Sequence, residues 1–575
     1  MLTTLPPEIF DIIIEQLSKR DLQSLSAVSR HTRSFSARTL WRSVVLRLVE
    51  GELHRIQTAP LPQQYYQLAT EFHFRCDFDF STYVHCPHIR NEGLTIGEDD
   101  DTDDEIDEDY DEHPDLLYFD RMARSAKLVL SRFADHQLRS FRWDLGTCIP
   151  SEILGSNGIV TLRQSRNLRS LHLITTTYCT RSWKNDDDTE IDLSSFRQLR
   201  SLSWKAPNPK NFKALAAALK SNSMHLQEFD LYIVHLEDSR GILEEDGDDD
   251  YEGGSYDLGA ILGMDRLSPR PYFPALRVLS LTEVPITPSM MAMADFSTLA
   301  SLTLRRCPGS AEFFAHIAKQ ASAINLQRLE FECWTGEILE PIREFISAFV
   351  GLEELFVLEF GPLDTIDRWN SVATNLRSLR RFVHHQRAFG EDLQGLAIVE
   401  FKREALLRKN SIQHHPFTRL DLECLGLPCA PGKLLRSILR PFRTKNSLKL
   451  LHLRQSYMDL FDCECLGLKK RLLDNGGLWS LYGPKGGMMD QAEALRGLRT
   501  RSRRFLEWAF GLNGLPSLQV VAFGDFGMND AHWKHNIIAC RDTKESTRFQ
   551  IISEFDPKMH TILSEYGDVL RACPY

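Results

Sequence analysis

Several features that would mark a membrane protein or a secreted protein are missing from this sequence. It holds no run of 18 or more apolar residues, so no membrane-spanning helix is expected. Its first residues lack the basic stretch and apolar run of a secretory signal. Twelve cysteines in 575 residues, without regular spacing, do not predict a disulfide framework. We therefore expect a soluble protein of the cytoplasm, the nucleus or both.

Motifs for catalysis, cofactors and metals are also missing. The glycine-rich stretch 483–487 lacks the spacing of a phosphate-binding loop, and no serine or cysteine stands in a G-x-S-x-G motif. Cys463 and Cys465 do not have the spacing of zinc ligands. His384 and His385 are adjacent and so point in different directions. We expect no cofactor, no metal site and no catalysis, although a site assembled from distant residues stays open.

Basic residues are absent from two strongly acidic tracts. Residues 98–112 hold twelve acids and residues 244–252 hold seven, with no base in either. Without these nineteen charges the net charge of −11 becomes −11 + 19 = +8, so the rest of the chain is mildly basic. Such dense runs repel themselves and stay solvated, which predicts two disordered acidic insertions. An alternative is that they shield a basic surface or mimic an anionic ligand.

What the sequence does contain begins with three short helical patterns. Pro6 and Pro7 suit the first positions of a helix. Apolar residues then recur at steps of three and four, a second pattern follows Asp21, and a third runs from about Arg30 to Trp41. A unit of this size buries too little surface to be robust alone. Its remaining apolar stripe should contact a partner, the rest of the chain, or both; the alternative is an ordinary helical cap.

A set of ordered motifs runs through this segment: Leu5-Pro6-Pro7-Glu8-Ile9, Leu17, Asp21-Leu22, Val28-Ser29-Arg30 and Leu40-Trp41. In these motifs residues 1–48 resemble the F-box, by which substrate receptors dock on the Skp-type adaptor of SCF (cullin–RING) ubiquitin ligases. Ser29 stands where the family usually has Cys. Trp41 is expected to pack where the F-box meets the rest of the chain. The resemblance implies these adaptor-docking residues: Leu5, Pro6, Glu8, Ile9, Ile13, Leu17, Leu22, Leu25 and Val28.

A second pattern, apolar-x-x-apolar-x-apolar, recurs through the rest of the chain. Between Leu276 and Leu376 its first positions step by 23, 27, 26 and 24 residues, a period typical of solenoids. A further copy starts at Leu376 but is broken by Arg381. The copies begin at Leu138, Leu168, Leu199, Leu226, Leu276, Leu299, Leu326, Leu352, Phe417, Leu448 and Leu518.

The intervening stretches carry apolar residues at helical spacing, so short strands should alternate with helices. This arrangement resembles the leucine-rich repeat. The predicted fold class is α/β, a small three-helix F-box followed by an irregular leucine-rich-repeat-like βα solenoid (horseshoe). The solenoid would span residues 49–575 and end in a strand and helix that cap it. An unrelated βα arrangement is the alternative, because unit lengths vary and leucine is common.

Side chains between the apolar positions of each copy should lie on the concave face of the horseshoe, because side chains alternate along a strand. A separate basic cluster precedes apolar residues in one helical pattern and could bind an anion; nucleic acid is ranked last. The predicted substrate contacts are His172, Ser203, Asp230, Glu330, Phe356 and His452. The basic cluster comprises Arg496, Arg499, Arg501, Arg503 and Arg504.

The two resemblances together imply the substrate-recognition subunit of an SCF-type E3 ubiquitin ligase. Its partners would be the Skp-type adaptor, cullin through that adaptor, and an unknown protein substrate. The alternative is a ligase-independent F-box and leucine-rich-repeat scaffold. An enzyme would need a deep pocket with converging titratable groups.

Overall fold

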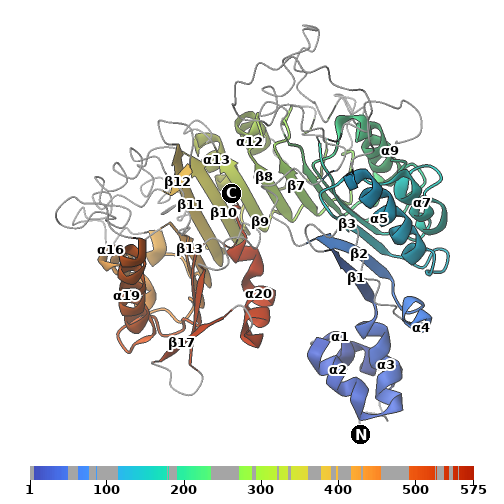
Figure 1. Cartoon of the computed structure of the whole chain (residues 1–575). Coiled ribbons are helices and arrows are strands. Elements are labelled where there is room, and N and C mark those ends of the chain that lie inside the picture. Colours follow the sequence, from blue (N-terminus) through green and yellow to red (C-terminus); the bar gives the residue numbers. More distant parts are fainter. Residues whose placement is uncertain are drawn as a thin grey trace, which may run out of the picture. The chain divides into compact units, whose positions relative to one another are not determined.

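Figure 1 shows the computed structural model of the chain. The structure describes residues 6–17, 19–48, 62–76, 86, 114–177, 179, 191–234, 259, 271–287, 290, 293–319, 323–333, 339–360, 377–389, 396–398, 416–428, 431–454, 491–524, 526, 536–542, 548–553 and 556–574. Leu5 and both acidic tracts lie outside these residues. The chain divides into two compact units, Met1–Leu276 (unit 1) and Arg277–Tyr575 (unit 2), and each is described by itself.

Unit 1 begins with three short helices, α1 (Pro7–Glu15), α2 (Lys19–Val28) and α3 (Arg30–Leu40). Ser29 caps α3, because its hydroxyl accepts a hydrogen bond of 3.1 Å from the backbone N–H of Thr32. Asp21 lies in the first turn of α2 rather than at its cap. The helices enclose a small core of Phe10, Ile14 and Leu22, with Leu17, Leu25, Phe35 and Leu40 packed against it.

A parallel sheet of six described strands follows in unit 1. Each strand pairs with the next along the chain in one register, which aligns Ser140, Ser170 and Ser201. The strands are β1 (Ser43–Leu48), β2 (Glu71–Cys76), β3 (Ser140–Asp144), β4 (Ser170–Ile174), β5 (Ser201–Lys205) and β6 (Glu228–Tyr232). The connecting helices are α4 (Gln63–Tyr66), α5 (Pro114–Leu130), α6 (Ser151–Leu154), α7 (Ile159–Gln164), η2 (Pro209–Asn211) and α9 (Phe212–Asn222).

The two faces of this sheet differ. Burial alternates along β2 to β6, so that the apolar positions of each strand are fully buried. Helices α5, α7 and α9 lie along one side of the strands (Figure 1). The alternate side chains face the other way and are mostly half-buried. We call this second side the open face of unit 1.

Two buried amide side chains connect successive coils of unit 1. Asn222, at the end of α9, accepts a hydrogen bond of 2.8 Å from the backbone N–H of Leu199 and donates to Phe196 O and Ala218 O. Gln164, at the end of α7, accepts one of 2.9 Å from the N–H of Leu138. Each amide therefore satisfies backbone groups that burial would otherwise leave unpaired. In both coils the amide also joins the end of a helix to the backbone of a neighbouring segment.

Unit 2 continues the alternation of parallel strands and helices. Its parallel strands are β7 (Val278–Thr282), β8 (Ser301–Arg305), β9 (Arg328–Cys333), β10 (Glu354–Phe360), β11 (Arg381–Phe389), β13 (Cys424–Leu427), β14 (Leu450–Leu453) and β15 (Val520–Phe523). The antiparallel strands β12 (Leu396–Ile398), β16 (Ile537–Arg541) and β17 (Phe549–Ile552) complete it. The helices are α12 (Ser310–Lys319), α13 (Leu339–Ser347), η7 (Pro416–Thr418), α16 (Lys433–Ile438), η8 (Arg440–Arg443), α19 (Gln491–Phe510) and α20 (Pro557–Leu570).

In unit 2 a helix also covers the second face of the strands. Helix α20 lies on the opposite side of the sheet from α16 and α19 (Figure 1). Its buried side chains share one core with the side chains of β10, β11, β13 and β14 that face it. Asp568 of α20 lies 2.5 Å from a guanidinium nitrogen of Arg381 on β11. We call α20 together with Ala572 and Cys573 the C-terminal cover.

The prediction of a mixed α/β chain with parallel strands linked by helices is confirmed, and the pairing within each unit is consistent with an α/β solenoid. The strand and helix predicted near the end are β17 and α20. Among the described residues, no helix has both the length and the apolar character needed to cross a membrane.

Three strands differ from the prediction. The copy assigned to Phe417 is wrong by five residues, because β13 starts at Cys424 and its apolar positions are Leu422, Leu425 and Leu427. The copy assigned to Leu376 is wrong by three residues, because β11 starts at Arg381 and its first apolar positions are Leu379 and Phe382. Strand β1 was not predicted, and residues 43–48 belong to the sheet rather than to the helical segment.

Candidate protein-interaction surfaces

The helical segment of unit 1 exposes apolar side chains on its outer side. Ile9 and Ile12 of α1 are 45% and 58% exposed, and Val28, the last residue of α2, is 74% exposed. On the same two helices Phe10, Ile14 and Leu22 are buried, so the exposed residues lie outside the core of the segment. Exposed aliphatic side chains grouped on one small segment are typical of a contact surface.

The structure separates the predicted docking residues by exposure. Pro6 is exposed together with Ile9 and Val28, whereas Ile13 is half-buried. The remaining described members belong to the core: Leu22 is buried, and Leu17 and Leu25 pack against it. Leu5 and the side chain of Glu8 lie outside the described part of the chain. Ile12 was missed by the prediction, although it lies on the same helix.

Trp41 connects the helical segment to the sheet. Its ring stacks on that of Tyr65 in α4, with centroids 4.0 Å apart and an interplanar angle of 24°. Beside it, the Arg42 Nε lies 2.7 Å from a carboxylate oxygen of Glu71, and Arg42 O accepts a hydrogen bond of 2.9 Å from the N–H of Thr70. Trp41 therefore packs at the junction, as expected from the sequence.

The open face of unit 1 is polar. On the middle register position of β4, β5 and β6 stand His172, Ser203 and Asp230. The Ser203 hydroxyl lies 2.8 Å from a carboxylate oxygen of Asp230. The structure thus brings three of the predicted substrate contacts onto adjacent strands; whether they bind a substrate stays a prediction.

A charged cluster that the sequence reading missed lies beside them. Asp144, at the end of β3, is 2.5 Å from His73 Nε2, 3.1 Å from His172 Nε2 and 3.2 Å from a guanidinium nitrogen of Arg142. Burial by itself raises the pKa of Asp144, but the two histidines and Arg142 outweigh it and hold this pKa well below its usual value. Arg142 could have been named, since it stands between the apolar positions of the Leu138 copy.

Comparison with protein families gives one match. Residues 2–47 match the family model described as F-box-like. The N-terminal segment is an F-box-like domain. F-box domains generally bind Skp-type adaptors, so the match suggests a role in ubiquitin ligase complexes. A comparison with curated proteins finds no match to this chain.

Beyond the F-box-like domain, the other three predicted substrate contacts lie in unit 2 and are buried. Glu330 is within 2.7 Å of Arg305, and it accepts a hydrogen bond of 2.8 Å from the N–H of Cys573 in the C-terminal cover. Phe356 belongs to the core beneath α20, and His452 Nε2 lies 2.8 Å from Gly524 O. The expectation that these three face a partner is not met in this structure, because the cover and the neighbouring loops occupy their side of the sheet.

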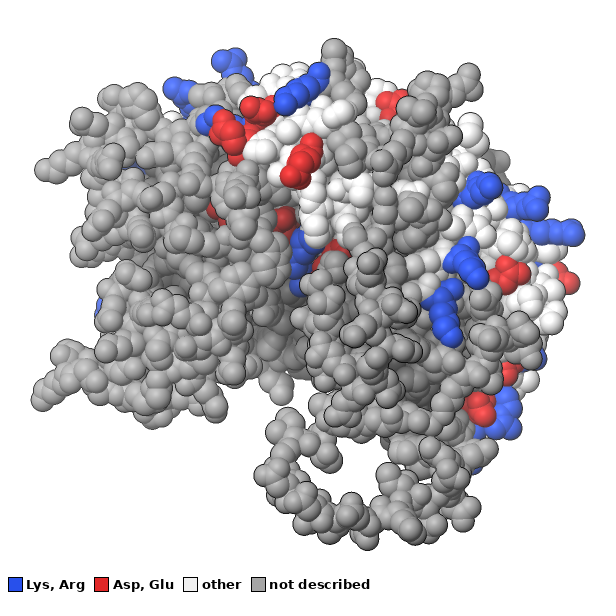
Figure 2. Space-filling view, turned by 90° about the horizontal axis from the view of Figure 1, so that it is seen from above, with Lys and Arg blue, Asp and Glu red and all other residues white. Residues whose placement is uncertain are grey.

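The predicted basic cluster lies on α19, but the side chains of Arg496, Arg499 and Arg501 are outside the described part of the chain. Arg503 lies 3.3 Å from Glu507 one turn further along the same helix, and Arg504 is exposed. Lys and Arg side chains are interspersed with Asp and Glu over the described surface visible in Figure 2. Nucleic-acid sites usually show a broad basic footprint, so anion binding stays a prediction and this surface adds no support for nucleic acid.

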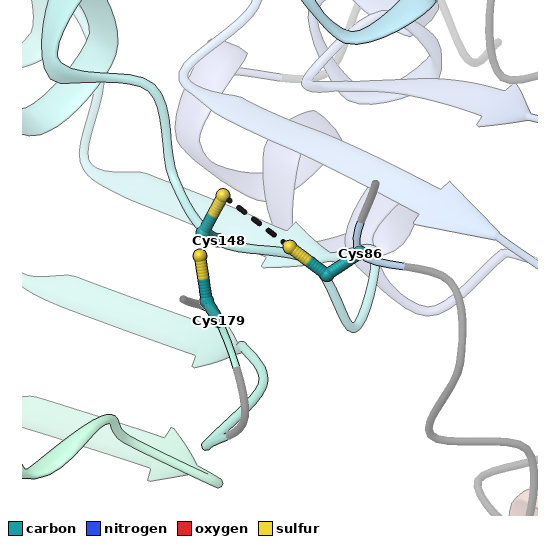
Figure 3. Close-up of side chains that lie close together, drawn as sticks. All are labelled: Cys86, Cys148 and Cys179. Carbon is teal, nitrogen blue, oxygen red and sulfur yellow. Dashed lines mark hydrogen bonds between the residues drawn. The ribbon is translucent and has the colours of Figure 1, made fainter. Parts of the chain in front are cut away.

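Three cysteines lie together in unit 1 (Figure 3). The sulfurs of Cys86, Cys148 and Cys179 are all within 4.8 Å of one another, and those of Cys86 and Cys148 are 3.6 Å apart. Cys86 and Cys179 are buried, and Cys148 is half-buried. The sequence reading expected no metal site and missed this group, because its members are 62 and 31 residues apart and only the stacking of coils brings them together.

Proposed function

We propose that this chain is the substrate-recognition subunit of an SCF-type (cullin–RING) E3 ubiquitin ligase. The F-box-like domain would dock on the Skp-type adaptor, which would connect it to cullin. The remaining coils, whose sequence pattern resembles the leucine-rich repeat, would hold a protein substrate. The chain would not act as an enzyme itself; it would contribute proximity and orientation. We expect it to work in the cytoplasm, the nucleus or both.

The observation that carries the adaptor proposal is the exposed apolar set on the F-box-like domain. Ile9, Ile12 and Val28 are exposed while the core of the domain is already closed behind them. Covering them with a partner would remove apolar surface from water. Each Å² of apolar surface buried in this way stabilises a complex by about 25 cal/mol. The match to a family whose members generally bind Skp-type adaptors supports the identity of that partner.

The open face of unit 1 is where we propose that the substrate binds. Its described side chains include acceptors and donors at short spacing, among them Asp144, His172, Ser203 and Asp230. Arg142 is 46% exposed beside them. In unit 2, by contrast, the corresponding side is filled by the C-terminal cover. A polar peptide segment of the substrate fits the open face better than an apolar one.

The adaptor proposal is tested by charge substitutions on the exposed set. The double variant Ile12→Glu/Val28→Glu should retain less than a tenth of the adaptor recovered with the wild-type chain after co-expression and pull-down. Both side chains are exposed, so the variant should melt as the wild type does. Met224→Glu is the matched control, because Met224 is 72% exposed but lies after α9, away from the F-box-like domain.

The outcomes separate the proposed roles. Wild-type chain that recovers no adaptor would overturn the docking proposal, as would full recovery by the double variant. Recovery of the adaptor without cullin would favour the alternative role, a ligase-independent scaffold, over that of a ligase subunit. For the substrate, proteins captured by the wild type should be compared by mass spectrometry with those captured by Arg142→Glu; identical sets would remove the open face from the proposal.

A further inference from the structure

We propose that Cys86, Cys148 and Cys179 bind a zinc ion that ties three successive coils of unit 1 together. The proposal does not depend on the ligase function. It rests on the placement of three thiols at one point of the fold, from segments that are far apart along the chain. Thiolate sulfur is a preferred ligand of Zn²⁺, and structural zinc sites are commonly built from three or four cysteines.

The spacing of the sulfurs fits a shared cation. A tetrahedral centre with Zn–S bonds of about 2.3 Å separates its sulfurs by about 3.8 Å. The sulfurs of Cys86 and Cys148 are 3.6 Å apart, and no pair in the group exceeds 4.8 Å. A disulfide would require a separation of about 2.05 Å. Figure 3 shows the three sulfurs close together, carried by three separate segments of the chain.

Hydrogen bonds hold the two loops that carry Cys148 and Cys179. Cys148 and Cys179 follow β3 and β4 by four and five residues (144 to 148, and 174 to 179), at the same end of the parallel strands. The Asn208 side chain donates hydrogen bonds of 2.9 Å to Thr177 O and 3.5 Å to Cys179 O. The Trp143 indole N–H donates to Thr147 O at 3.4 Å. Ligands fixed by such neighbours lose little freedom when they bind a metal.

Binding must release thiol protons, because the thiolate is the ligand. Burial raises the pKa of the Cys86 thiol to about 12. The pKa of Cys148 is raised as well, chiefly by its hydrogen bond with the Cys179 thiol and then by that with Cys86. Without a cation these groups are therefore neutral thiols, and a divalent ion would displace their protons to solvent.

Three cysteines leave the fourth position of a tetrahedral ion to another ligand. The proposal rests on the three thiols and assigns no residue to that position. The ion would fix the chain at Cys86, twelve residues before the acidic tract that begins at residue 98.

The test is the metal content of the full-length chain, purified without a chelating tag and analysed for zinc, copper and iron by plasma mass spectrometry. We expect about one zinc per chain in the wild type and at least a tenfold loss in Cys86→Ser, Cys148→Ser and Cys179→Ser. Cys307→Ser is the matched control: Cys307 is also buried, but its thiol lies 3.3 Å from Leu281 O in unit 2. It should keep its zinc.

Less than a tenth of a zinc per chain in the wild type would overturn the proposal, and so would zinc retained by all three variants or copper found in its place. A disulfide between any two of the three cysteines, detected by mass spectrometry of the alkylated native protein, would also overturn it. If the variants do not fold, the proposal is tested on the wild type instead, by adding cobalt(II) after its metal has been removed with a chelator. A tetrahedral thiolate site gives intense near-ultraviolet charge-transfer absorption, and its absence refutes the site.

Discussion

At the scale of single residues, the open face of unit 1 is organised by one carboxylate. Asp144 draws His73, His172 and Arg142 together from three strands. Its side chain is only 13% exposed, so water replaces these partners poorly. An ionised carboxylate at this depth requires charged or hydrogen-bonding partners. Removing its charge should therefore lower both the free energy of unfolding and the affinity for the proposed substrate.

Asp144→Asn should lower the free energy of unfolding by about 1–3 kcal/mol at pH 7. The pKa of Asp144 is lowered in the folded chain, so its contribution is present above the unfolded value of about 3.9 and is lost as the pH falls towards the folded value. The difference between variant and wild type should therefore shrink as the pH falls below about pH 4. Urea titrations between about pH 5 and pH 2 measure it, and a difference that does not shrink below about pH 4 would contradict the assignment.

Only part of this cluster was accessible from the sequence. Strand alternation was enough to select His172, Ser203 and Asp230, which do occupy one register position on adjacent strands. It could not select Asp144, which follows the last apolar position of its copy. That residue reaches His172 only because β3 and β4 pair in the observed register. The three cysteines were inaccessible for a similar reason.

At the scale of elements, the C-terminal cover is the feature with the largest consequence. Helix α20 contributes buried side chains to the core over β10, β11, β13 and β14, and the Glu330 carboxylate binds the backbone N–H of Cys573. Burial by itself raises the pKa of Glu330, but Arg305 and Arg328 outweigh it and hold this pKa below its usual value. A charged carboxylate therefore holds the cover at its end.

Ile562→Ala on α20 should lower the free energy of unfolding of unit 2 by about 2–5 kcal/mol, because it empties a buried contact of the shared core. Leu512→Ala is the control: Leu512 is 93% exposed, and its loss should change the value by less than about 0.5 kcal/mol. Denaturant midpoints give both numbers. Equal effects of the two substitutions would mean that α20 does not pack on the sheet.

The existence of α20 was predictable from its apolar spacing, but its position was not. An amphipathic helix at 557–570 fits the end of a stack as well as a second face of the sheet, and only the tertiary structure selects between them. The same applies to the shifted register of β13. Two overlapping copies of the pattern are present, Phe417-Leu420-Leu422 and Leu422-Leu425-Leu427, and pairing with β11 and β14 selects the later one.

At the scale of the whole molecule, the densest negative charge is concentrated in two short tracts. The acidic tracts carry nineteen of the acids but lie outside the described cores. Composition predicts that they are disordered insertions, because dense like charge opposes burial, and this stays a prediction. The sequence also predicted the F-box-like domain and the alternating strands and helices. It could not predict the division into units Met1–Leu276 and Arg277–Tyr575.

Deleting residues 98–112 should shift the melting temperature by less than about 2 °C, since a run of twelve acids without a base opposes burial. The deletion changes the net charge from −11 to −11 + 12 = +1. The deleted chain should therefore bind a cation-exchange resin more strongly at pH 7. A drop of 5 °C or more, measured by calorimetry, would show that the tract has a structural role.

The order of synthesis gives the C-terminal cover one more consequence. Residues 557–573 leave the ribosome after every strand that they cover. In nascent unit 2, Phe356, Leu358 and Val383 therefore stay exposed to solvent until the C-terminal cover has been synthesised. Until then these side chains are a ready target for chaperones and for self-association. A chain whose synthesis stops before residue 557 would keep these apolar side chains exposed, so chaperones could distinguish it from the complete protein.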